Sequence, residues 1–303
     1  MALTLLVREM RCKGCAQHVV DAIWSVLPSA RVRVDMLRNM VTVSASPTDE
    51  ARVVAAIVDA GYETSVSEGC VRPDERFFAR RAEARARLDQ INPHLQRNGD
   101  PDDPFFDRWF ATVYESAGED AANIPWAALS PNPLLIDWLT GAELHGVRAL
   151  DVGCGLGDNA EALSSAGADT TAFDYVERPI AWAKRRFPLS DVSYCVADLL
   201  NPPQHWRGAF DFVHECYTLQ TMRPEHLSRC AHALAALLAP RGRLLVISSA
   251  REEDALPTTP WRPLSRREIE AIAVDGLALA ELDDIPKEGC VDRRWRALFE
   301  KTS

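Results

Sequence analysis

Over the first 66 residues, the spacing of apolar positions switches twice from the period of a strand to that of a helix. Apolar residues alternate from Leu3 to Val7, which predicts a strand, and then recur with a helical period over residues 16–27. Two further alternating runs, RVRVDM and MVTVSA, are joined by a turn-prone segment and predict a hairpin. A second helical period starts near Thr48 and ends at Gly61, and ETSV supplies a last strand. The predicted order is strand, helix, strand, strand, helix, strand.

This order is that of the split βαβ, or ferredoxin-like, arrangement, with both helices on one face of an antiparallel sheet. We expect it to fill residues 1–67. Residues 68–104 are charged and alanine-rich and then crowded with helix breakers, which predicts a partly helical linker. Apolar residues from Phe77 to Ile91 share one helical face, so we expect this linker helix to pack against the protein.

Strand-like and helical runs alternate from Val147 onward. The strands are predicted in VRALDVG, ADTTAFD, VSYCVA, FDFVHE and RLLVISS. Such alternation predicts a mostly parallel sheet with helices on both faces, and two later runs, LALAELDD and RRWRALFEK, raise the number of strands to seven. The predicted fold class is therefore α/β: a seven-stranded, doubly wound, Rossmann-like domain over residues 105–303, preceded by the small α+β domain.

Composition narrows the class of protein. With 303 residues and 47% hydrophobic content, the chain is long enough for two packed domains. Its formal net charge of −10 argues against nucleic acid and anionic membranes as partners, so a small molecule is expected instead. Eight cysteines are too few for a disulfide scaffold, and no apolar run approaches the ~18 residues of a membrane span. The first residues lack the apolar core of a secretory signal, so we expect a cytoplasmic protein with reduced thiols.

The stretch LDVGCGLGD follows a buried-type strand and opens a helix, which is where a parallel sheet binds a nucleotide-like ligand. A dinucleotide site requires G-x-G-x-x-G, whose third glycine lies below a pyrophosphate at the helix N-terminus. Here the glycines are Gly153, Gly155 and Gly157, and Asp158 takes the position of that third glycine. A carboxylate there would repel a pyrophosphate. The spacing therefore favours a ligand without phosphates that carries a sulfonium and an amino group.

This stretch resembles motif I of the class I S-adenosylmethionine-dependent methyltransferases, and the resemblance covers roughly the last 200 residues. In that family an acidic residue at the end of the second strand binds the ribose hydroxyls, and another after the third strand contacts the adenine amino group. Asp174 and Asp198 match these positions. The resemblance implies S-adenosylmethionine as cofactor, with these contact residues: Asp151, Gly153, Gly155, Gly157, Asp174, Tyr175, Asp198, Leu199 and His214.

Three further stretches, FDFVHECYTLQTM, SSAREEDALPTTPWRPLSRREI and FFDRWFATVY with NIPW, resemble the thiopurine and small-molecule branch of this class. The resemblance implies a soft acceptor, either a thiol or a metal or metalloid species. The residues predicted to line the substrate side are Trp109, Trp126, Cys216 and Tyr217. A core role is the alternative for the two tryptophans, and a metalloid site centred on Cys216 is an alternative for that cysteine.

Transfer of a methyl group from a sulfonium is an in-line displacement, so most of the catalysis is expected from positioning and desolvation. A thiolate acceptor needs little further activation. For an acceptor that has to lose a proton, His214 and Glu215 at the carboxyl end of the fourth strand are the predicted catalytic residues. The equally weighted alternative for His214 is a cofactor-pocket or core histidine.

Cys12 and Cys15 lie between the first strand and the first helix, where the helix N-terminus and the basic neighbours favour thiolates. Two thiolates on a loop bind a soft ion in near-linear geometry. A structural zinc site normally needs four ligands, and the sequence offers no second cysteine pair. A redox pair, which would fit a different element order, and an inert remnant are the alternatives to a metal site.

The whole of residues 1–67 resembles heavy-metal-associated domains. The shared features are the cysteine pair, the element order, Met10 two residues before Cys12, and Tyr62 in the run AGY. The resemblance implies a soft metal ion, Cu(I) or Hg(II), held by Cys12 and Cys15, with Tyr62 beside the metal loop. A metal-donor protein is then a candidate partner.

The leading hypothesis from the sequence is an S-adenosylmethionine-dependent methyltransferase for a soft acceptor, fused to a domain that captures or senses a soft ion. Two alternatives stay open. In the first, the protein is a metal-trafficking or metal-responsive protein whose methyltransferase fold is regulatory. In the second, the acceptor is an oxygen or nitrogen atom of a small metabolite, such as a metal-chelating one.

Overall fold

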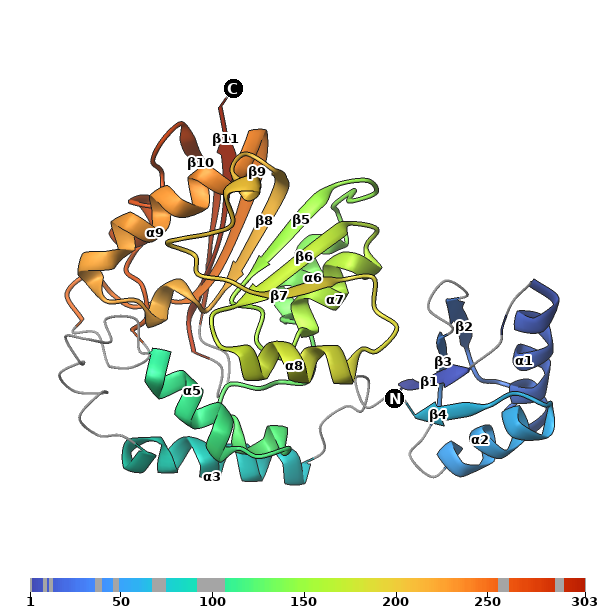
Figure 1. The fold of residues 1–303 in the computed structure, drawn as a ribbon. Helices are drawn as coiled ribbons and strands as arrows, with labels where there is room; N and C mark the ends of the chain where they lie inside the picture. Colours follow the sequence, from blue (N-terminus) through green and yellow to red (C-terminus); the bar gives the residue numbers. More distant parts are fainter. Residues whose placement is uncertain are drawn as a thin grey trace. The chain divides into compact units, whose positions relative to one another are not determined.

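The structure is a computed structural model. It describes residues 2–7, 10, 13–35, 40–45, 49–66, 75–91, 107–255, 262–286 and 292–302. The chain forms two compact units: a smaller one that contains Met1–Pro73, and a larger one that contains Asp74–Ala183 and Asp191–Ser303 (Figure 1). Each unit is described by itself below.

The smaller unit is a four-stranded antiparallel sheet with strand order β2-β3-β1-β4 and two helices. Its elements are β1 (Ala2–Val7), α1 (Lys13–Val26), β2 (Val32–Asp35), β3 (Met40–Ser44), α2 (Glu50–Asp59) and β4 (Thr64–Val66). This order is the predicted ferredoxin-like topology, which is thereby confirmed.

One apolar core joins the sheet and both helices of the smaller unit. Leu5 and Val43 from the sheet and Ile23 and Ile57 from the helices are fully buried in it. Burial of side chains of this size contributes on the order of 2 kcal/mol each. The second helix ends where Gly61, with φ of +89°, lets its own amide donate to the Val58 carbonyl (2.9 Å).

The larger unit is built on a seven-stranded sheet with strand order β10-β11-β9-β8-β5-β6-β7. Its strands are β5 (Arg148–Val152), β6 (Asp169–Asp174), β7 (Ser193–Val196), β8 (Phe210–Cys216), β9 (Leu238–Ser249), β10 (Leu277–Ile285) and β11 (Arg294–Lys301). Strands β5 to β9 pair in parallel, and β11 and β10 are added antiparallel. The predicted doubly wound α/β fold is confirmed. The strand order reverses at β5, and ligands of such sheets bind at the carboxyl ends beside that reversal.

Helices cover both faces of this sheet (Figure 1). They are α3 (Glu75–Ile91), α5 (Asp107–Ser116), α6 (Pro133–Leu139), α7 (Asp158–Ser165), α8 (Glu177–Arg186), α9 (Pro224–Leu237) and α10 (Arg266–Glu270), with 3-10 turns η3 (Ala121–Asn123), η4 (Gln204–Trp206) and η5 (Leu219–Thr221). One apolar cluster joins α9 to β8, β9 and β11, and a second joins α6 and α7 to the opposite face. The run SRREIEAIAV has a helical pattern up to Val274, but α10 ends at Glu270, and the chain then turns through Asp275 and Gly276, both at positive φ, into β10.

Helix α3 lies inside the segment predicted as a linker and packs on the larger unit. Phe77 is half-buried against Trp126 and its neighbours. The Arg81 guanidinium donates to the Ala127 carbonyl (2.6 Å), and Arg80 pairs with Asp120. The N-terminal half of α3 thus buttresses the segment between α5 and α6. The side chains of Leu88 and Ile91 lie outside the described residues.

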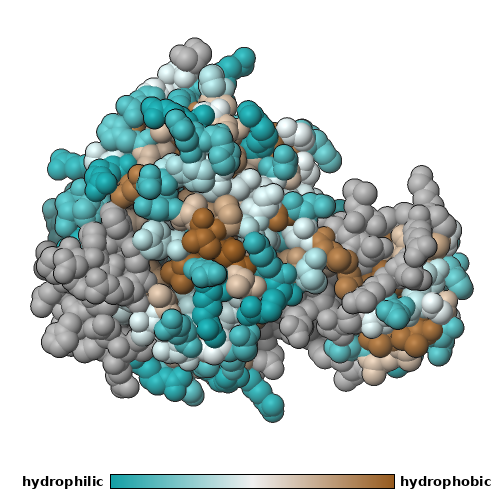
Figure 2. Space-filling view, in the orientation of Figure 1, coloured by the Kyte–Doolittle hydropathy of each residue, from teal (hydrophilic) through white to brown (hydrophobic). Residues whose placement is uncertain are grey.

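The surface offers few apolar features. Figure 2 shows a mostly hydrophilic face on the larger unit, interrupted by a small group of apolar side chains. The large apolar side chains with the greatest exposure are Trp24, Val58, Phe78, Ile136, Tyr175, Leu189 and Val196. Within the described ranges, no helix has the length and apolar character needed to cross a membrane. The chemistry is therefore best sought at the strand ends, where polar side chains gather.

Candidate functional site

The loop between β5 and α7 depends on three glycines. Gly153, Gly155 and Gly157 have φ of +64°, +52° and +91°, a region that side-chain-bearing residues rarely adopt. A Cβ atom on Gly153 would collide with the Thr218 hydroxyl, and one on Gly157 would collide with the Tyr194 hydroxyl. The loop is thus a tight backbone cradle at the start of α7.

Asp174 ends β6 with its carboxylate against this cradle. One oxygen accepts a hydrogen bond from the Gly155 amide (3.1 Å), and the other accepts one from the Val176 amide (2.9 Å). Burial raises the pKa of Asp174, while the backbone hydrogen bonds oppose that rise. A third backbone hydrogen bond comes from the Tyr175 amide, so the two oxygens together keep capacity for a further hydrogen bond from a ligand. The adjacent Tyr175 is half-exposed.

Asp198 follows β7 at the same edge of the sheet as Asp174. Strands β6 and β7 pair in parallel with Asp174 opposite Val196, so the two carboxylates follow neighbouring strands. One Asp198 oxygen accepts a hydrogen bond from the Leu200 amide (2.8 Å), and Leu199 is buried. The structure therefore brings together the glycine cradle and both predicted carboxylates, from three separate strand ends.

His214 and Asp151 form a buried pair across β8 and β5. They are register partners, and the His214 Nδ1 lies 2.7 Å from an Asp151 oxygen. Both side chains are at most 2% exposed, and among the described residues neither the His214 Nε2 nor the second Asp151 oxygen has a hydrogen-bond partner. This pair ties the two central strands together directly beneath the glycine cradle.

Glu215 is also fully buried, and its hydrogen bonds go to the backbone. One oxygen accepts from the amides of Thr218 and Leu219 (2.8 Å to Leu219), which fixes the turn η5 after β8. Burial raises the pKa of Glu215 to about 8. The predicted catalytic role of His214 and Glu215 stays a prediction, and the structure places both beneath the surface of the site.

Cys216 and Tyr217 lie at the carboxyl end of β8, beside the N-terminus of α6. The Asn132 amide donates to the Cys216 sulfur (3.3 Å), and burial raises the pKa of this thiol well above its usual value. Tyr217 has a positive φ of 65° and is half-buried. Burial raises the pKa of Tyr217, and hydrogen bonds with Asn132 and Arg294 oppose that rise.

The predicted alternative of a metalloid site on Cys216 finds no support in this geometry. In the part of the chain that the structure describes, no three His, Cys, Asp or Glu side chains are grouped as metal ligands. A neutral, hydrogen-bonded thiol is also a poor metal ligand, because the thiolate is the binding form. The place of Cys216 on the substrate side stays a prediction.

An aromatic cluster from α5 and the segment after it borders the cradle. Trp109 is fully buried beneath Phe110 and Trp126, whose rings lie 4.9 and 5.9 Å from its own. The Trp126 Nε1 donates to the Tyr114 hydroxyl (3.1 Å), and a Cβ atom on Gly155 would lie 3.4 Å from that hydroxyl. The residue that reaches the cradle is therefore Tyr114, which ends the FFDRWFATVY stretch but was not among the predicted site residues. Trp109 lies one layer behind it.

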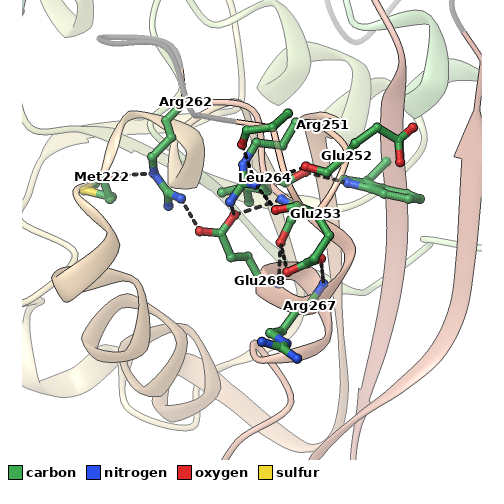
Figure 3. A network of polar contacts seen from close by, with 11 residues as sticks. Met222, Arg251, Glu252, Glu253, Arg262, Leu264, Arg267 and Glu268 are labelled. Atoms are coloured by element: carbon green, nitrogen blue, oxygen red, sulfur yellow. Dashed lines mark hydrogen bonds and ion pairs between the residues drawn. The ribbon is translucent and has the colours of Figure 1, made fainter.

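A polar network holds the segment that follows β9 (Figure 3). The guanidinium groups of Arg251 and Arg262 both point at Glu268, and the Arg251–Glu268 distance is 2.9 Å. The Arg262 Nε also donates to the Met222 carbonyl (3.3 Å), which links this segment to the turn after β8. These contacts fix the segment that follows β9 against the turn after β8.

In the smaller unit, Cys15 lies in the first turn of α1, half-buried and not in a disulfide. The Tyr62 hydroxyl donates to the Cys15 carbonyl (3.4 Å), and the Tyr62 ring lies 5.8 Å from that of His18. Met10 is buried, as the resemblance implies. Cys12, the other predicted ligand, lies outside the described residues.

Comparisons with known proteins fit both units. Residues 4–63 match the family model of the heavy-metal-associated domain, and residues 149–242 match that of a methyltransferase domain. The chain therefore carries a heavy-metal-associated domain followed by a methyltransferase domain of the S-adenosylmethionine-dependent class, as the two resemblances predicted. The finer likeness to the thiopurine branch stays a prediction.

Similar proteins include two ubiquinone biosynthesis O-methyltransferases. The one from Aromatoleum aromaticum is 34% identical over 116 residues, which are 37% of this chain and 49% of the relative. The one from Dechloromonas aromatica is 48% identical over 118 residues, 38% of this chain and 50% of the relative. The chain thus spans about half the length of these relatives.

Among solved structures, one concerns the conversion of a disulfide bond into a thioacetal group during echinomycin biosynthesis. It matches with a TM-score of 0.54 and 20% identity, over 64% of this chain and 92% of that chain. At this identity, the match bears on the fold alone.

Proposed function

We propose that this chain, which joins a heavy-metal-associated domain to a methyltransferase domain, transfers a methyl group from S-adenosylmethionine to a small-molecule acceptor. The observation that carries the proposal is the Asp174 carboxylate against the glycine cradle, bonded to the Gly155 amide at 3.1 Å. The cofactor, when bound, supplies an electrophilic methyl group on a sulfonium. Its own lack of phosphates fits a helix that begins with Asp158 and has Glu161 in the same turn.

Each part of the site then has a task. The remaining acceptor capacity of Asp174 serves the ribose hydroxyls, and Asp198 with Leu199 borders the adenine. Gly153, Gly155 and Gly157 let the backbone approach the cofactor closely. We assign the methionine end to the cradle and to Asp151 and His214 below it.

Tyr114 adds a contact that the sequence did not indicate. Its hydroxyl accepts a hydrogen bond from Trp126, so its own proton is available for donation at the edge of the cradle. Because Tyr114 is only 3% exposed, this donor is shielded from water. We propose that it donates to the carboxylate of the cofactor's methionine moiety and so orients the sulfonium.

The acceptor is proposed to be nucleophilic without help from a general base. His214 and Glu215 have no exposed surface, and Glu215 is committed to backbone amides. A thiolate or another soft atom is already nucleophilic when it binds and needs no deprotonation by the protein, which agrees with the leading hypothesis. Positioning and exclusion of water between Tyr114, Trp126 and Cys216 are then the main contributions to rate.

Oxygen methylation is the second candidate, and a specific observation favours it. Relatives 34% and 48% identical to the matched segment are named ubiquinone biosynthesis O-methyltransferases. An oxygen acceptor that is already ionised, such as a catecholate, would also need no buried base. The two candidates differ in the acceptor atom alone.

For the smaller unit we propose a soft ion, Cu(I) or Hg(II), bound by Cys12 and Cys15. The place of Cys15 in the first turn of α1 stabilises a thiolate there, because the helix N-terminus carries partial positive charge. The ion would serve as substrate or regulator of the methyltransferase domain, since tethering raises local concentration to ~mM for short linkers.

The test is radiolabelled methyl transfer by the intact chain to a panel of thiols, catechols, arsenite and mercuric ion, with and without one equivalent of Cu(I). Transfer to thiols or to the inorganic ions supports the soft acceptor, and transfer to catechols alone supports the second candidate. The control is the double variant Cys12→Ser, Cys15→Ser. Absence of transfer to every acceptor, with metal binding intact, contradicts the enzyme and favours a metal-responsive protein.

A further inference from the structure

Arg294 stands at the acceptor side of the larger unit. It begins β11 and is the register partner of Ser249 at the end of β9, so it lies at the carboxyl end of the parallel strands. Side chains alternate along a strand, so Arg294 shares a face with Arg296. The Arg296 guanidinium donates to the Leu134 carbonyl of α6 (3.3 Å), which places Arg294 toward the N-terminus of that helix.

Two polar side chains meet Arg294 there. Asn132 caps α6, and both Asn132 and Arg294 lie within hydrogen-bond reach of the Tyr217 hydroxyl. The backbone amide of Asn132 donates to the side-chain oxygen of Asn159 (2.8 Å), and Asn159 lies in the first turn of α7. Helix α7 starts at the glycine cradle, so this cluster adjoins the proposed cofactor site.

Among the residues that the structure describes, no carboxylate balances the charge of Arg294. Other arginines of this region each pair with a carboxylate: Arg251 and Arg262 with Glu268 (Figure 3), Arg293 with Asp284, and Arg296 with Asp283. Arg294 forms no ion pair with any residue that the structure describes, and its buried Nε has no hydrogen-bond partner.

A half-buried guanidinium with a desolvated, unpaired donor is costly in an isolated protein, and a bound anion removes that cost. The overall charge of −10 makes an arginine without a carboxylate partner more notable, because acidic side chains outnumber basic ones. The positive φ of Tyr217 points the same way, since backbone strain of this kind gathers at binding sites.

We propose that Arg294, with Asn132 and Tyr217, is an anion subsite that binds a carboxylate of the methyl acceptor. The guanidinium fork matches a carboxylate in a bidentate contact, and the Tyr217 hydroxyl, which Asn132 and Arg294 hold in place, adds a neutral donor. This inference rests on the proposed function, because it places the subsite beside the cofactor. It makes the acceptor an acid, whether its methylated atom is sulfur or oxygen.

The experiment is calorimetric binding to the intact chain saturated with S-adenosylhomocysteine, using two acid–amide pairs as probes. The pairs are thiosalicylate and 3,4-dihydroxybenzoate, each with its primary amide. In the wild type, at least one acid is expected to bind about tenfold more tightly than its amide. Arg294→Met should reduce this preference to below about twofold, while Arg294→Lys should keep part of it.

The matched control is Arg229→Met, which removes the same charge from an exposed position on α9 and should leave the preference unchanged. An acid preference that survives Arg294→Met, or the absence of any acid preference in the wild type, overturns the inference. Binding of S-adenosylhomocysteine is read separately in each variant. If the wild type does not bind S-adenosylhomocysteine, the proposed function is contradicted. If it binds S-adenosylhomocysteine but shows no preference for the acids, the anion subsite alone is contradicted.

Discussion

The two units carry their chemistry in different ways. In the smaller unit the proposed ligands, Cys12 and Cys15, come from one short segment where a strand meets a helix. In the larger unit the proposed contacts come from the ends of separate strands, from Asp151 on β5 to Arg294 on β11. The first site therefore depends on two side chains, and the second depends on the backbone of the whole sheet. Substitutions in the larger unit should therefore change stability and cofactor binding, and substitutions of the cysteines in the smaller unit should change metal binding.

The largest effect is expected in the glycine cradle. Gly157→Ala forces a Cβ atom into the Tyr194 hydroxyl at a φ of +91°, so the larger unit should lose about 3 kcal/mol of stability and detectable binding of S-adenosylhomocysteine. Gly118→Ala is the matched control: its φ is +64° but the space around it is open, so it should cost only about 1 kcal/mol. Denaturant unfolding and calorimetry measure both. Equal behaviour of the two variants would show that the cradle is not tightly packed.

The next effect is a pH dependence confined to the larger unit. The pKa of Glu215 is raised from 4.5 to about 8 in the folded chain, so folding takes up a proton between these values. Stability is therefore expected to fall as the pH rises from 4.5 to about 8, by up to ~5 kcal/mol, and to level off above that.

The variant Glu215→Gln should lack this slope, because its amide oxygen still accepts from Thr218 and Leu219 but does not ionise. The measurement is urea unfolding of both proteins at several pH values between 5 and 9. In roughly this range the Glu215 carboxyl titrates in the folded chain but is already ionised in the unfolded chain. A slope that persists unchanged in Glu215→Gln would assign the dependence to another group.

A smaller effect is expected from Asp174→Asn. The substitution replaces one of the two oxygens that accept from the Gly155 and Val176 amides by an NH2 group, and it removes the charge proposed to bind the ribose hydroxyls. S-adenosylhomocysteine should therefore bind about 10- to 100-fold more weakly. Asp169→Asn, at the exposed start of the same strand, should leave binding unchanged. Metal binding by the smaller unit should be the same in both variants. Calorimetry with the intact chain measures these constants.

The smallest effect on methyl transfer is expected from the other unit. Cys12→Ser with Cys15→Ser should abolish Cu(I) binding, yet change methyl transfer to a thiol, measured without metal, by less than about twofold, since neither cysteine is among the residues proposed to contact the cofactor or the acceptor. A chelator competition and the radiolabel assay give the two readouts. Loss of methyl transfer in this variant would show that the two sites act as one functional unit and not independently.

The parts of this molecule that the sequence predicted are those governed by local periodicity and by motifs. Both sheets follow from alternation and helical spacing, and the Gly153–Asp158 spacing separated one cofactor class from another. Asp174 could be found because the resemblance to class I methyltransferases implies an acidic residue at the end of the second strand. These features depend on residues that are neighbours in the chain.

The parts that the sequence missed depend on packing between distant segments. Tyr114 reaches the cradle only because α5 is held by Trp126 and α3, and Arg294 becomes notable only because its neighbours find carboxylates that it does not. The burial of His214 and Glu215 likewise follows from how α6, α7 and α9 cover the sheet. No spacing in the sequence carries that information.

The central claim is that the carboxyl ends of the larger unit's strands hold S-adenosylmethionine and not a dinucleotide. It is tested most directly by calorimetric titration of the intact wild-type chain with S-adenosylhomocysteine and, separately, with NADH. The account predicts one-to-one binding of S-adenosylhomocysteine and no binding of NADH, because Asp158 at the start of α7 repels a pyrophosphate. Binding of NADH, or no binding of S-adenosylhomocysteine, would contradict it.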